Sequence, residues 1–160
     1  MNGGWLRTAT IAAAVGSGVM GGVYFAFSTF VMPALRRLPA DRAVAAMQAI
    51  NRAAPAPFVV VGLLGAGGTC VALAIEPITD LHDGAARWRL AGSGLYLVSL
   101  VITFGFHVPR NEALDRVDVA DRGAGPAWEE FVGSWTAGNH VRAIVSVAAA
   151  TMLSYALTVS

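Results

Sequence analysis

Four long stretches of the chain carry almost no charged side chains. The first spans residues 8–31, which are 24 uncharged positions in a row, and three more lie at about residues 53–75, 90–108 and 143–159. Each is close to the roughly 20 residues that a helix needs to cross the hydrocarbon core of a membrane. Helices are expected because unpaired backbone amides are costly in lipid. The pattern therefore predicts an all-α fold in which residues 1–160 form one domain, an integral membrane four-helix bundle made of two helical hairpins.

The polar segments that join the first two stretches and the last two are predicted to contain short helices. In the first connection, Pro39 and Asp41 resemble a helix start. In the second, Trp128, Phe131 and Trp135 recur at helical spacing after a Gly-Pro pair. Aromatic stripes of this kind usually mark a helix that lies along the membrane interface. We therefore expect short interfacial helices in loops one and three.

The two halves of the chain show a short internal similarity. Aromatic residues precede a proline at position 33 in the first half and at position 109 in the second. A polar side chain then leads back into the next apolar stretch, at Asn51 and at residues 139–142. A duplication would explain this pattern and would place both polar ends on the same membrane face, although short repeats also arise by chance.

Composition and charge support a membrane location and suggest an orientation. Hydrophobic residues make up 56% of the chain and charged residues 13%, which is too apolar for an ordinary soluble domain. All eleven cations are arginines, so lysine Schiff-base chemistry is excluded. Eight of them fall in loops one and three and three in the N-terminus and loop two. The positive-inside rule then predicts that loops one and three are cytoplasmic, in the plasma membrane.

Several kinds of site lack their usual sequence signatures. Cys70 is the single cysteine and is expected to be a small packing residue, so a thiol–disulfide oxidoreductase is not indicated. His107 and His140 could approach each other and hold a metal or a haem, with Met32, Met47 or Glu112 as further ligands, but no ligand motif accompanies them. We therefore predict no cofactor. The chain also has no glycine-rich phosphate loop and no basic patch for nucleic acid.

His107 is the strongest single candidate for chemistry. An ionisable group near the end of a membrane helix is costly unless it is paired or functional. His107 shares a helical face with Leu100 and Phe104, and a continued helix would extend that face to Asn111. Imidazole titrates near neutrality and could serve as a general base. The alternative interpretation is a histidine at the headgroup boundary.

A second group of candidates precedes and enters the fourth stretch. Trp135, Asn139 and Arg142 stand at i, i+4 and i+7, so one helix would align an indole, an amide and a guanidinium. Such a group could grip a flat, oxygenated ligand by stacking and charge-assisted hydrogen bonds. Alternatively, Arg142 is a positive-inside anchor and Trp135 belongs to an aromatic belt.

Five short motifs resemble the anthrone oxygenase family of small four-helix integral membrane proteins. They are GGVYFAF at residues 21–27, MPAL at 32–35, MQAIN at 47–51, PRNEAL at 109–114, and Trp135 with Asn139 and Arg142. The resemblance covers most of the chain. It implies oxidation of a polycyclic phenol, of the anthrone-to-quinone type, by molecular oxygen without an organic cofactor.

The resemblance also implies roles for residues of this chain. His107 is expected to be the base, because the anthrone methylene is acidic and its carbanion can give an electron to oxygen directly. Hydrogen-bond donors are expected to stabilise the oxyanion that develops. The remaining predicted site residues are Asn111, Asn139 and Arg142 as donors, Trp135 and Phe104 as stacking walls, and Asn51 and Tyr24 as further substrate contacts.

A competing hypothesis is a non-catalytic membrane module that binds a lipid, a quinone or a partner protein. Small residues at positions 14, 18, 22 and 26 form a stripe suited to close helix packing, within one chain or between copies in a homo-oligomer. The expected partners are an aromatic small molecule and membrane lipid, and nucleic acid is not expected. The two hypotheses differ in geometry: the enzyme requires the candidate side chains to meet in one pocket.

Overall fold

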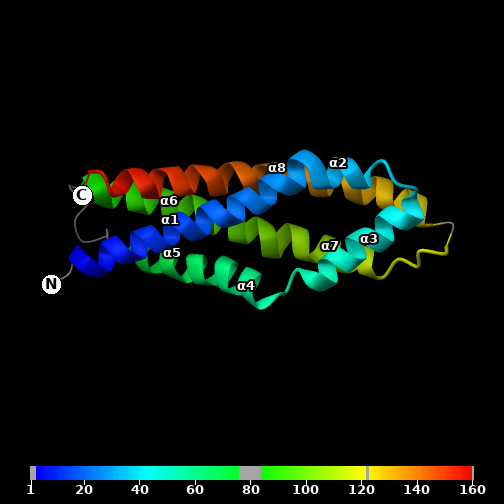
Figure 1. Ribbon diagram of the computed structural model, residues 1–160, viewed down its shortest axis with the longest axis horizontal. Coiled ribbons are helices and arrows are strands. Elements are labelled where there is room, and N and C mark those ends of the chain that lie inside the picture. The colour runs from blue at the N-terminus through cyan, green and yellow to red at the C-terminus, as the bar shows by residue number, and fades with distance from the viewer. Residues whose placement is uncertain (1–2, 76–83, 122, 160) are drawn as a thin grey trace.

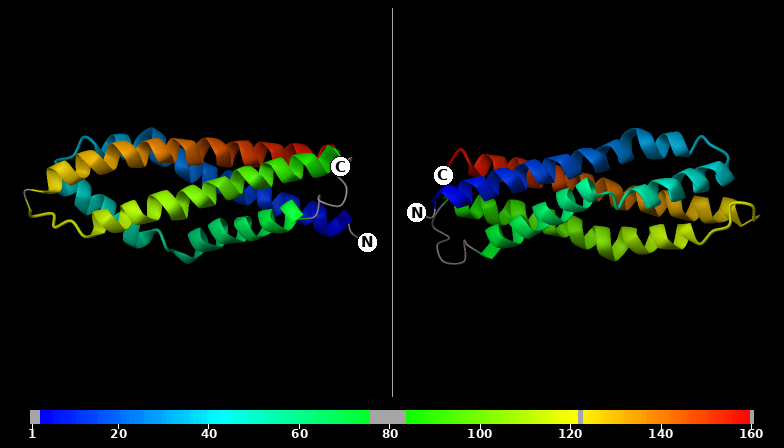
Figure 2. Two further views of the ribbon diagram at one scale, coloured as in Figure 1. Left: turned by 180° about the vertical axis from the view of Figure 1, so that it is seen from behind. Right: turned by 60° about the horizontal axis from the view of Figure 1, so that its bottom comes forward.

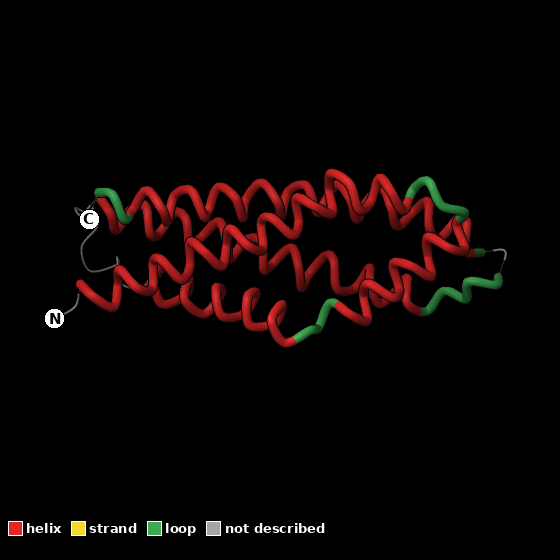
Figure 3. The backbone as a smooth tube through the Cα atoms, in the orientation of Figure 1, coloured by secondary structure: helices red, strands yellow, loops and turns green. Residues whose placement is uncertain are grey.

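The computed structural model describes residues 3–75, 84–121 and 123–159, and this part of the chain folds into helices joined by short turns. No strand occurs among the described residues, so the predicted all-α fold is confirmed. Figure 3 shows the helices as a single elongated assembly, with short loops between them. Both described ends of the chain lie at the same end of the molecule (Figure 1).

Five continuous helical segments make up the described chain. The first runs from Gly3 to Leu35 and the fourth from Gly84 to Asp115, and each contains one π-helical turn. In order, the elements are α1 (Gly3–Ala26), η1 (Phe27–Val31), α2 (Met32–Leu35), α3 (Ala40–Ala53), α4 (Pro57–Val60), η2 (Val61–Gly65), α5 (Ala66–Ile75), α6 (Gly84–Ile102), η4 (Thr103–His107), α7 (Val108–Asp115) and α8 (Ala124–Ala156). The symbol η marks a π-helical turn.

The helix boundaries differ from the predicted ones where prolines or packing intervene. The second stretch begins at Pro57 and not at residue 53, because α3 continues to Ala53 and is followed by a turn that contains Pro55. A proline restricts the residue before it to extended conformations, so a helix tends to end there. The fourth stretch is the second half of α8, which begins far upstream at Ala124.

Membrane-spanning potential is clear for two of the four predicted crossings. Among the described residues, Gly3–Leu35 and Gly84–Asp115 are long and apolar enough to cross a membrane by length and composition. Val61–Ile75 is apolar but shorter. These helices are compatible with membrane insertion.

The helices pack in two regions, which follow each other along the long axis of the molecule. At the end with the termini, α1 packs on α8 and α5, and α6 packs on α8 and α5. At the other end, α3 packs on α7 and on the first half of α8, as Figures 1 and 2 show. Each half has its own apolar core. The first contains Tyr24, Cys70 and Tyr96, and the second contains Met47, Leu114 and Trp135.

Of the two short helices predicted in loops one and three, the first is present: α3 begins at Ala40, beside Pro39 and Asp41. The second is not a separate helix but forms the first part of α8. The stripe of Trp128, Phe131 and Trp135 belongs to α8 and is buried in the second core. Val44 and Met47 of α3 are buried in the same core. The apolar faces of these helices therefore pack against each other along the bundle axis, and lipid is not needed to cover them.

Close helix contacts occur at small residues, but only part of the stripe predicted in the first helix takes part: Ala14 is buried, and a Cβ at Gly18 would lie 3.7 Å from Ala150 Cβ. Gly22 of that stripe is exposed and has no atom near the position of a Cβ. Gly21 instead faces α8, where a Cβ would lie 3.1 Å from Val147 Cγ2. At Gly92, a Cβ would lie 2.8 Å from Leu153 Cγ and 3.1 Å from the backbone oxygen of Ala149. Glycine at position 92 thus permits the approach of α6 to α8.

Candidate functional site

Three π-helical turns lie around one point of the molecule, where the two cores meet. A π-turn accommodates one extra residue in a helix and redirects the side chains that follow. Here each π-turn places side chains on a common cavity: Phe27 from η1, Leu63 from η2, and Thr103, Phe104 and His107 from η4. Irregular turns of this kind occur often at functional sites.

The cavity has a volume of about 300 Å³ and mainly apolar walls. Its lining comes from five helical segments and includes Met20, Val23, Tyr24, Phe27, Met47, Ile50, Asn51, Ala54, Pro55, Val59, Val60, Leu63, Thr103, Phe104, His107, Val108, Asn111, Trp135 and Arg142. Seven of the eight predicted site residues are among them, and Asn139 is the exception. The volume is at the lower end of the range of roughly 300–1,000 Å³ that is typical of small-molecule sites.

Arg142 is the only charged residue in the described lining of this cavity. Its side chain is buried, at 6% relative exposure, and no ion pair joins it to a carboxylate among the described residues. The guanidinium carbon lies 4.2 Å from the centre of the Tyr24 ring and 5.5 Å from that of Trp135. Its Nη1 donates to Thr103 Oγ1 at 3.2 Å, whereas its buried Nε has no hydrogen-bond partner. A buried cation without a counter-ion favours an anionic or strongly polarised oxygen as its ligand.

Asn139 does not line the cavity but holds Arg142 in place. Its Oδ1 accepts a hydrogen bond from Arg142 Nη2 at 2.7 Å. Its Nδ2 donates to the backbone oxygen of Tyr24 at 2.7 Å and to Ser28 Oγ at 2.8 Å. Since a backbone carbonyl can only accept, the amide orientation is fixed with the oxygen toward the guanidinium. The side chain is fully buried and is satisfied by protein groups.

Trp135 and Asn111 form the second polar contact of the cavity wall. Trp135 Nε1 donates to Asn111 Oδ1 at 2.7 Å, which joins α8 to α7. The indole is buried and lies 5.7 Å from the Phe27 ring and 5.0 Å from the His107 ring, centre to centre. The amide of Asn111 is thereby turned toward the indole, and its Nδ2 remains as the donor available to a ligand.

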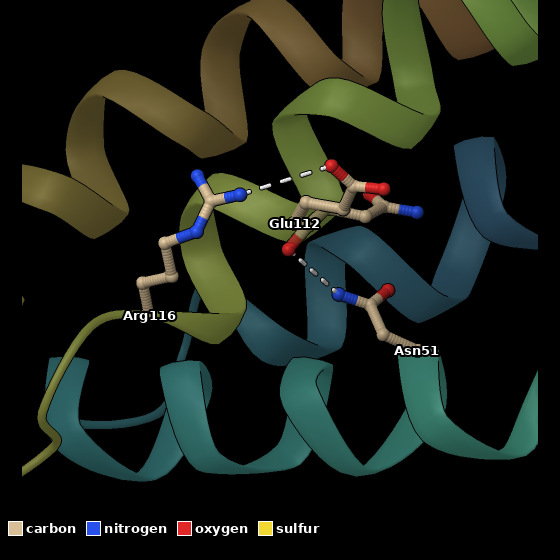
Figure 4. Close-up of polar contacts among 4 residues, drawn as sticks. Asn51, Glu112 and Arg116 are labelled. Carbon is tan, nitrogen blue, oxygen red and sulfur yellow. Dashed lines mark hydrogen bonds and ion pairs between the residues drawn. The ribbon is translucent and has the colours of Figure 1, made fainter.

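Asn51 closes the end of the cavity nearest the charged surface. It extends from α3 toward α7, where Glu112 and Arg116 lie one turn apart (Figure 4). Its Nδ2 donates to the backbone oxygen of Asn111 at 3.5 Å and to Asp115 Oδ1 at 3.2 Å. Asn51 therefore contributes mainly to holding α3 against α7 at the cavity wall.

His107 is buried, and both of its ring nitrogens face backbone carbonyl oxygens. Nδ1 lies 3.3 Å from the oxygen of Ile102, and Nε2 lies 3.2 Å from the oxygen of Trp135. A neutral imidazole has one N–H group, so only one of these contacts can be a hydrogen bond at a time. The other nitrogen then carries a lone pair without a donor.

Phe104 lies at the mouth of the cavity and not deep in its wall. Its side chain is 51% exposed, and the neighbouring lining residues Ala54, Pro55 and Val60 are exposed as well. The regular helix assumed from the sequence placed Phe104 and His107 on one face, but the π-turn η4 changes the phase between them. The mouth is therefore surrounded by Phe104 and its apolar neighbours Ala54, Pro55 and Val60.

His140 is exposed and faces away from this cavity, so it does not approach His107 as a pair of ligands. Among the described residues, no group of three or more His, Cys, Asp or Glu side chains is placed to hold a metal ion. Cys70 is a buried free cysteine in the first core, as its apolar surroundings predicted.

Sequence reasoning missed two polar residues of this site, Ser28 and Thr103. Ser28 follows Tyr24 by four positions and binds Asn139, and Thr103 precedes His107 by four positions and binds Arg142. The available signal was a small hydroxyl residue one helical turn from a candidate residue within an apolar helix. Such residues also bond to their own helix backbone, as Thr103 does to Ser99, and the sequence does not distinguish the two uses.

The comparisons with known proteins give one match. The family model described as anthrone oxygenase matches residues 46–152. This range includes η4, α7 and most of α8, together with part of α3. No curated protein and no solved structure matches the chain.

Proposed function

The chain belongs to the anthrone oxygenase family, and from this premise we propose that it oxidises a fused-ring phenol of the anthrone type with molecular oxygen in the cavity beside Arg142. The supporting observation is the buried Arg142 guanidinium, which has no carboxylate partner among the described residues and lies beside the Tyr24 and Trp135 rings. A flat aromatic ligand can stack on such rings while its oxygen receives a hydrogen bond from the guanidinium.

The reaction balances with oxygen as the only other reactant. Anthrone and one O₂ give anthraquinone and one water: the methylene carbon loses two hydrogens and gains one oxygen atom, and the second oxygen atom leaves as water. Loss of a methylene proton produces a carbanion whose charge is delocalised onto the ring oxygen. The positive charge of Arg142 favours that anion, because a fixed donor in an apolar cavity stabilises charge without having to reorient.

His107 is the group in the cavity lining that can accept the methylene proton. The ring nitrogen that does not donate to a carbonyl keeps its lone pair, and because that nitrogen also faces a backbone oxygen, the ring has to turn toward the substrate to accept the proton. Trp135 and Phe104 bound the space for the ring system, and Asn111 and Tyr24 offer further donors to a substituent oxygen. Asn139 acts on the substrate only through Arg142.

We also propose that α1, α5, α6 and α8 form the membrane-embedded four-helix bundle. Branched apolar side chains are largely exposed on each of these helical segments, at Val15, Val61, Val101 and Ile144. The exposed rings of Trp5, Trp88 and Tyr155 lie near the end that holds the termini, where an aromatic belt would meet the headgroups. The arginine-rich opposite end is then cytoplasmic, at the plasma membrane.

The alternative function is binding without catalysis, of a quinone or lipid in the same cavity. The apolar mouth around Phe104 and Val60 supports this alternative equally well. The two functions differ in oxygen consumption, which only the enzyme shows.

The direct test is oxygen uptake and quinone absorbance with anthrone, using the protein purified in detergent. We expect Arg142→Gln to lower kcat by about 10²–10³, the usual cost of losing one oxyanion donor, while Arg142→Lys retains part of the rate. Arg116→Gln, an exposed arginine outside the cavity, is the matched control and should leave the rate unchanged. Tight anthrone binding without oxygen uptake in the unaltered protein would instead support the non-catalytic module.

A further inference from the structure

A second cavity lies between α7 and the first half of α8 and shares no lining residue with the first. Its volume is about 270 Å³. Leu114 and Phe131, both buried, supply its apolar floor, and Arg110, Glu130 and Ser134 supply polar groups on its walls. The proposed oxidation does not use this groove.

The two charged side chains of the groove come from opposite walls and do not pair with each other. Arg110 belongs to α7 and Glu130 to α8, and no ion pair joins either of them to another described residue. The guanidinium of Arg110 lies 3.5 Å from the centre of the Phe106 ring, and its Nη1 donates to the Phe106 backbone oxygen at 3.1 Å. An arginine has five N–H donors, so most of those on Arg110 remain available.

The groove begins where the exposed apolar surface ends. Along η4 and α7, the half-exposed Phe104 comes first and Arg110 follows it. The exposed charged residues Glu112 and Arg116 come after Arg110. On α8, the exposed Val141 and Ile144 give way to the exposed Glu130. The groove therefore lies at the level expected for phospholipid headgroups.

The order of the two charges along the groove is fixed by the packing of α7 on α8. Gly138 touches Phe106, since a Cβ there would lie 2.5 Å from Phe106 Cε1. One turn farther from the membrane on each helix come Arg110 and Ser134, and Glu130 follows one turn beyond Ser134. Four residues of helix correspond to about 6 Å. The cation is thus nearer the membrane, and the carboxylate lies about one helical turn outward.

We propose that this groove binds the headgroup of a zwitterionic phospholipid with a primary amine, a phosphatidylethanolamine. In such a headgroup the phosphate is nearer the acyl chains and the ammonium is farther out, which matches the order of Arg110 and Glu130. Arginine binds phosphate through paired N–H donors. A primary ammonium donates hydrogen bonds to a carboxylate, whereas the quaternary amine of choline has no N–H to donate. The inference rests on the proposed membrane insertion and is independent of the oxidation.

The test is a binding titration of the delipidated protein in detergent with short-chain phosphatidylethanolamine, followed by native mass spectrometry. Phosphatidylcholine of the same chain length is the comparison lipid. We expect Arg110→Gln to weaken binding of both lipids by roughly tenfold, about the contribution of one charge-assisted hydrogen bond. Glu130→Gln should abolish the preference for phosphatidylethanolamine. Arg116→Gln and Glu129→Gln make the same charge changes outside the groove and should have no effect.

Three results would overturn the proposal. One is equal affinity for the two lipids in the unaltered protein. Another is a loss of binding in Arg116→Gln or Glu129→Gln as large as that in the groove variants. The third is equally tight binding of soluble phosphoethanolamine, which would indicate a site for a free phosphate compound. Oxygen uptake with anthrone, measured on the same variants, should be unchanged, so failure of the lipid site and failure of the proposed oxidation are distinguishable.

Discussion

Some side chains at this site face the cavity, and others hold the cavity-facing side chains in position. Arg142 faces the cavity, and Asn139 behind it accepts one of its hydrogen bonds and donates two to α1 and η1. The pair is buried without an acidic residue to neutralise the charge among the described residues. Unpaired buried charge is costly, so the arrangement indicates a function that needs the positive charge.

Asn139 offers a residue-scale test of positioning. We expect Asn139→Asp to keep a contact with Arg142 but to neutralise its charge and to lose both donor bonds to Tyr24 and Ser28. Asn139→Ala should lower the free energy of unfolding by about 1–3 kcal/mol, and the ion pair in Asn139→Asp should restore part of that loss. The kcat for anthrone oxidation should nevertheless fall at least as far in Asn139→Asp as in Asn139→Ala. Steady-state kinetics and thermal unfolding of both variants measure this. A purely structural Asn139 would make activity follow stability across the two variants.

Trp135 allows the stacking and hydrogen-bonding roles to be separated. Trp135→Phe keeps an aromatic ring but removes the 2.7 Å hydrogen bond to Asn111. We expect a loss of about 1 kcal/mol in the free energy of unfolding, and a rise in KM with little change in kcat. Trp135→Ala should in addition reduce substrate binding severely. Equal kinetics for Trp135→Phe and Trp135→Ala would contradict a stacking role.

Among the elements, the three π-turns and the contact of η4 with α8 decide the shape of the cavity. In a regular helix, Phe104 and His107 would lie on the same face. The π-turn η4 allows His107 to point inward while Phe104 stays at the mouth. Side chains bond to carbonyls at or beside these turns: Asn139 to Tyr24, Tyr96 to Leu63 at 3.3 Å, and the ring of His107 faces Ile102. These contacts help to satisfy the backbone groups that a π-turn displaces.

Gly138 tests the approach of η4 to α8. A Cβ at this position would lie 2.5 Å from Phe106 Cε1 and 3.0 Å from His107 Cε1. We expect Gly138→Ala to displace η4, to cost about 1–3 kcal/mol of stability, and to lower the rate of anthrone oxidation. Gly133→Ala on the same helix is the matched control, because nothing lies within 4 Å of its Cβ position. It should be neutral or stabilising by up to about 1 kcal/mol, as thermal unfolding would show.

For the molecule as a whole, the cavity lies between a half with an apolar exterior and a half with charged residues on its surface. The first half contains the core around Tyr96 and Cys70, and the second contains the core around Met47 and Trp135. In the proposed membrane arrangement, a ligand dissolved in the membrane can reach a cavity at this junction, and the polar end of the cavity at Asn51 lies toward water.

The proposed orientation can be tested by labelling single cysteines in a Cys70→Ala background. We expect a cysteine at position 118, in the turn before α8, to react with a membrane-impermeant maleimide in inverted vesicles but not in intact cells. A cysteine at position 158, after α8, should react in intact cells. Labelling of both positions from the same side would contradict an odd number of crossings between them. The reversed pattern would invert the orientation and leave the fold unchanged.

The sequence by itself determined the helical fold, the apolar segments and most of the polar residues that line the cavity. Long uncharged segments exclude most other folds, and a polar side chain in such a segment is conspicuous because its burial is costly. The aromatic stripe of Trp128 and Phe131 was assigned to the interface because periodicity shows that a helix has an apolar face, but not whether lipid or another helix covers that face. Only the tertiary structure decided this, by packing the stripe into the second core.

The tertiary structure alone also decided which candidate residues face the cavity. Asn139 and Arg142 were expected to contact the substrate together, yet Asn139 lies behind Arg142, and Phe104 lies at the mouth. A regular period of 3.6 residues cannot anticipate a π-turn, because one extra residue shifts the phase of every side chain that follows by about 100°. Whether a helix accepts that shift depends on the helices packed around it, and that information is not local in the sequence.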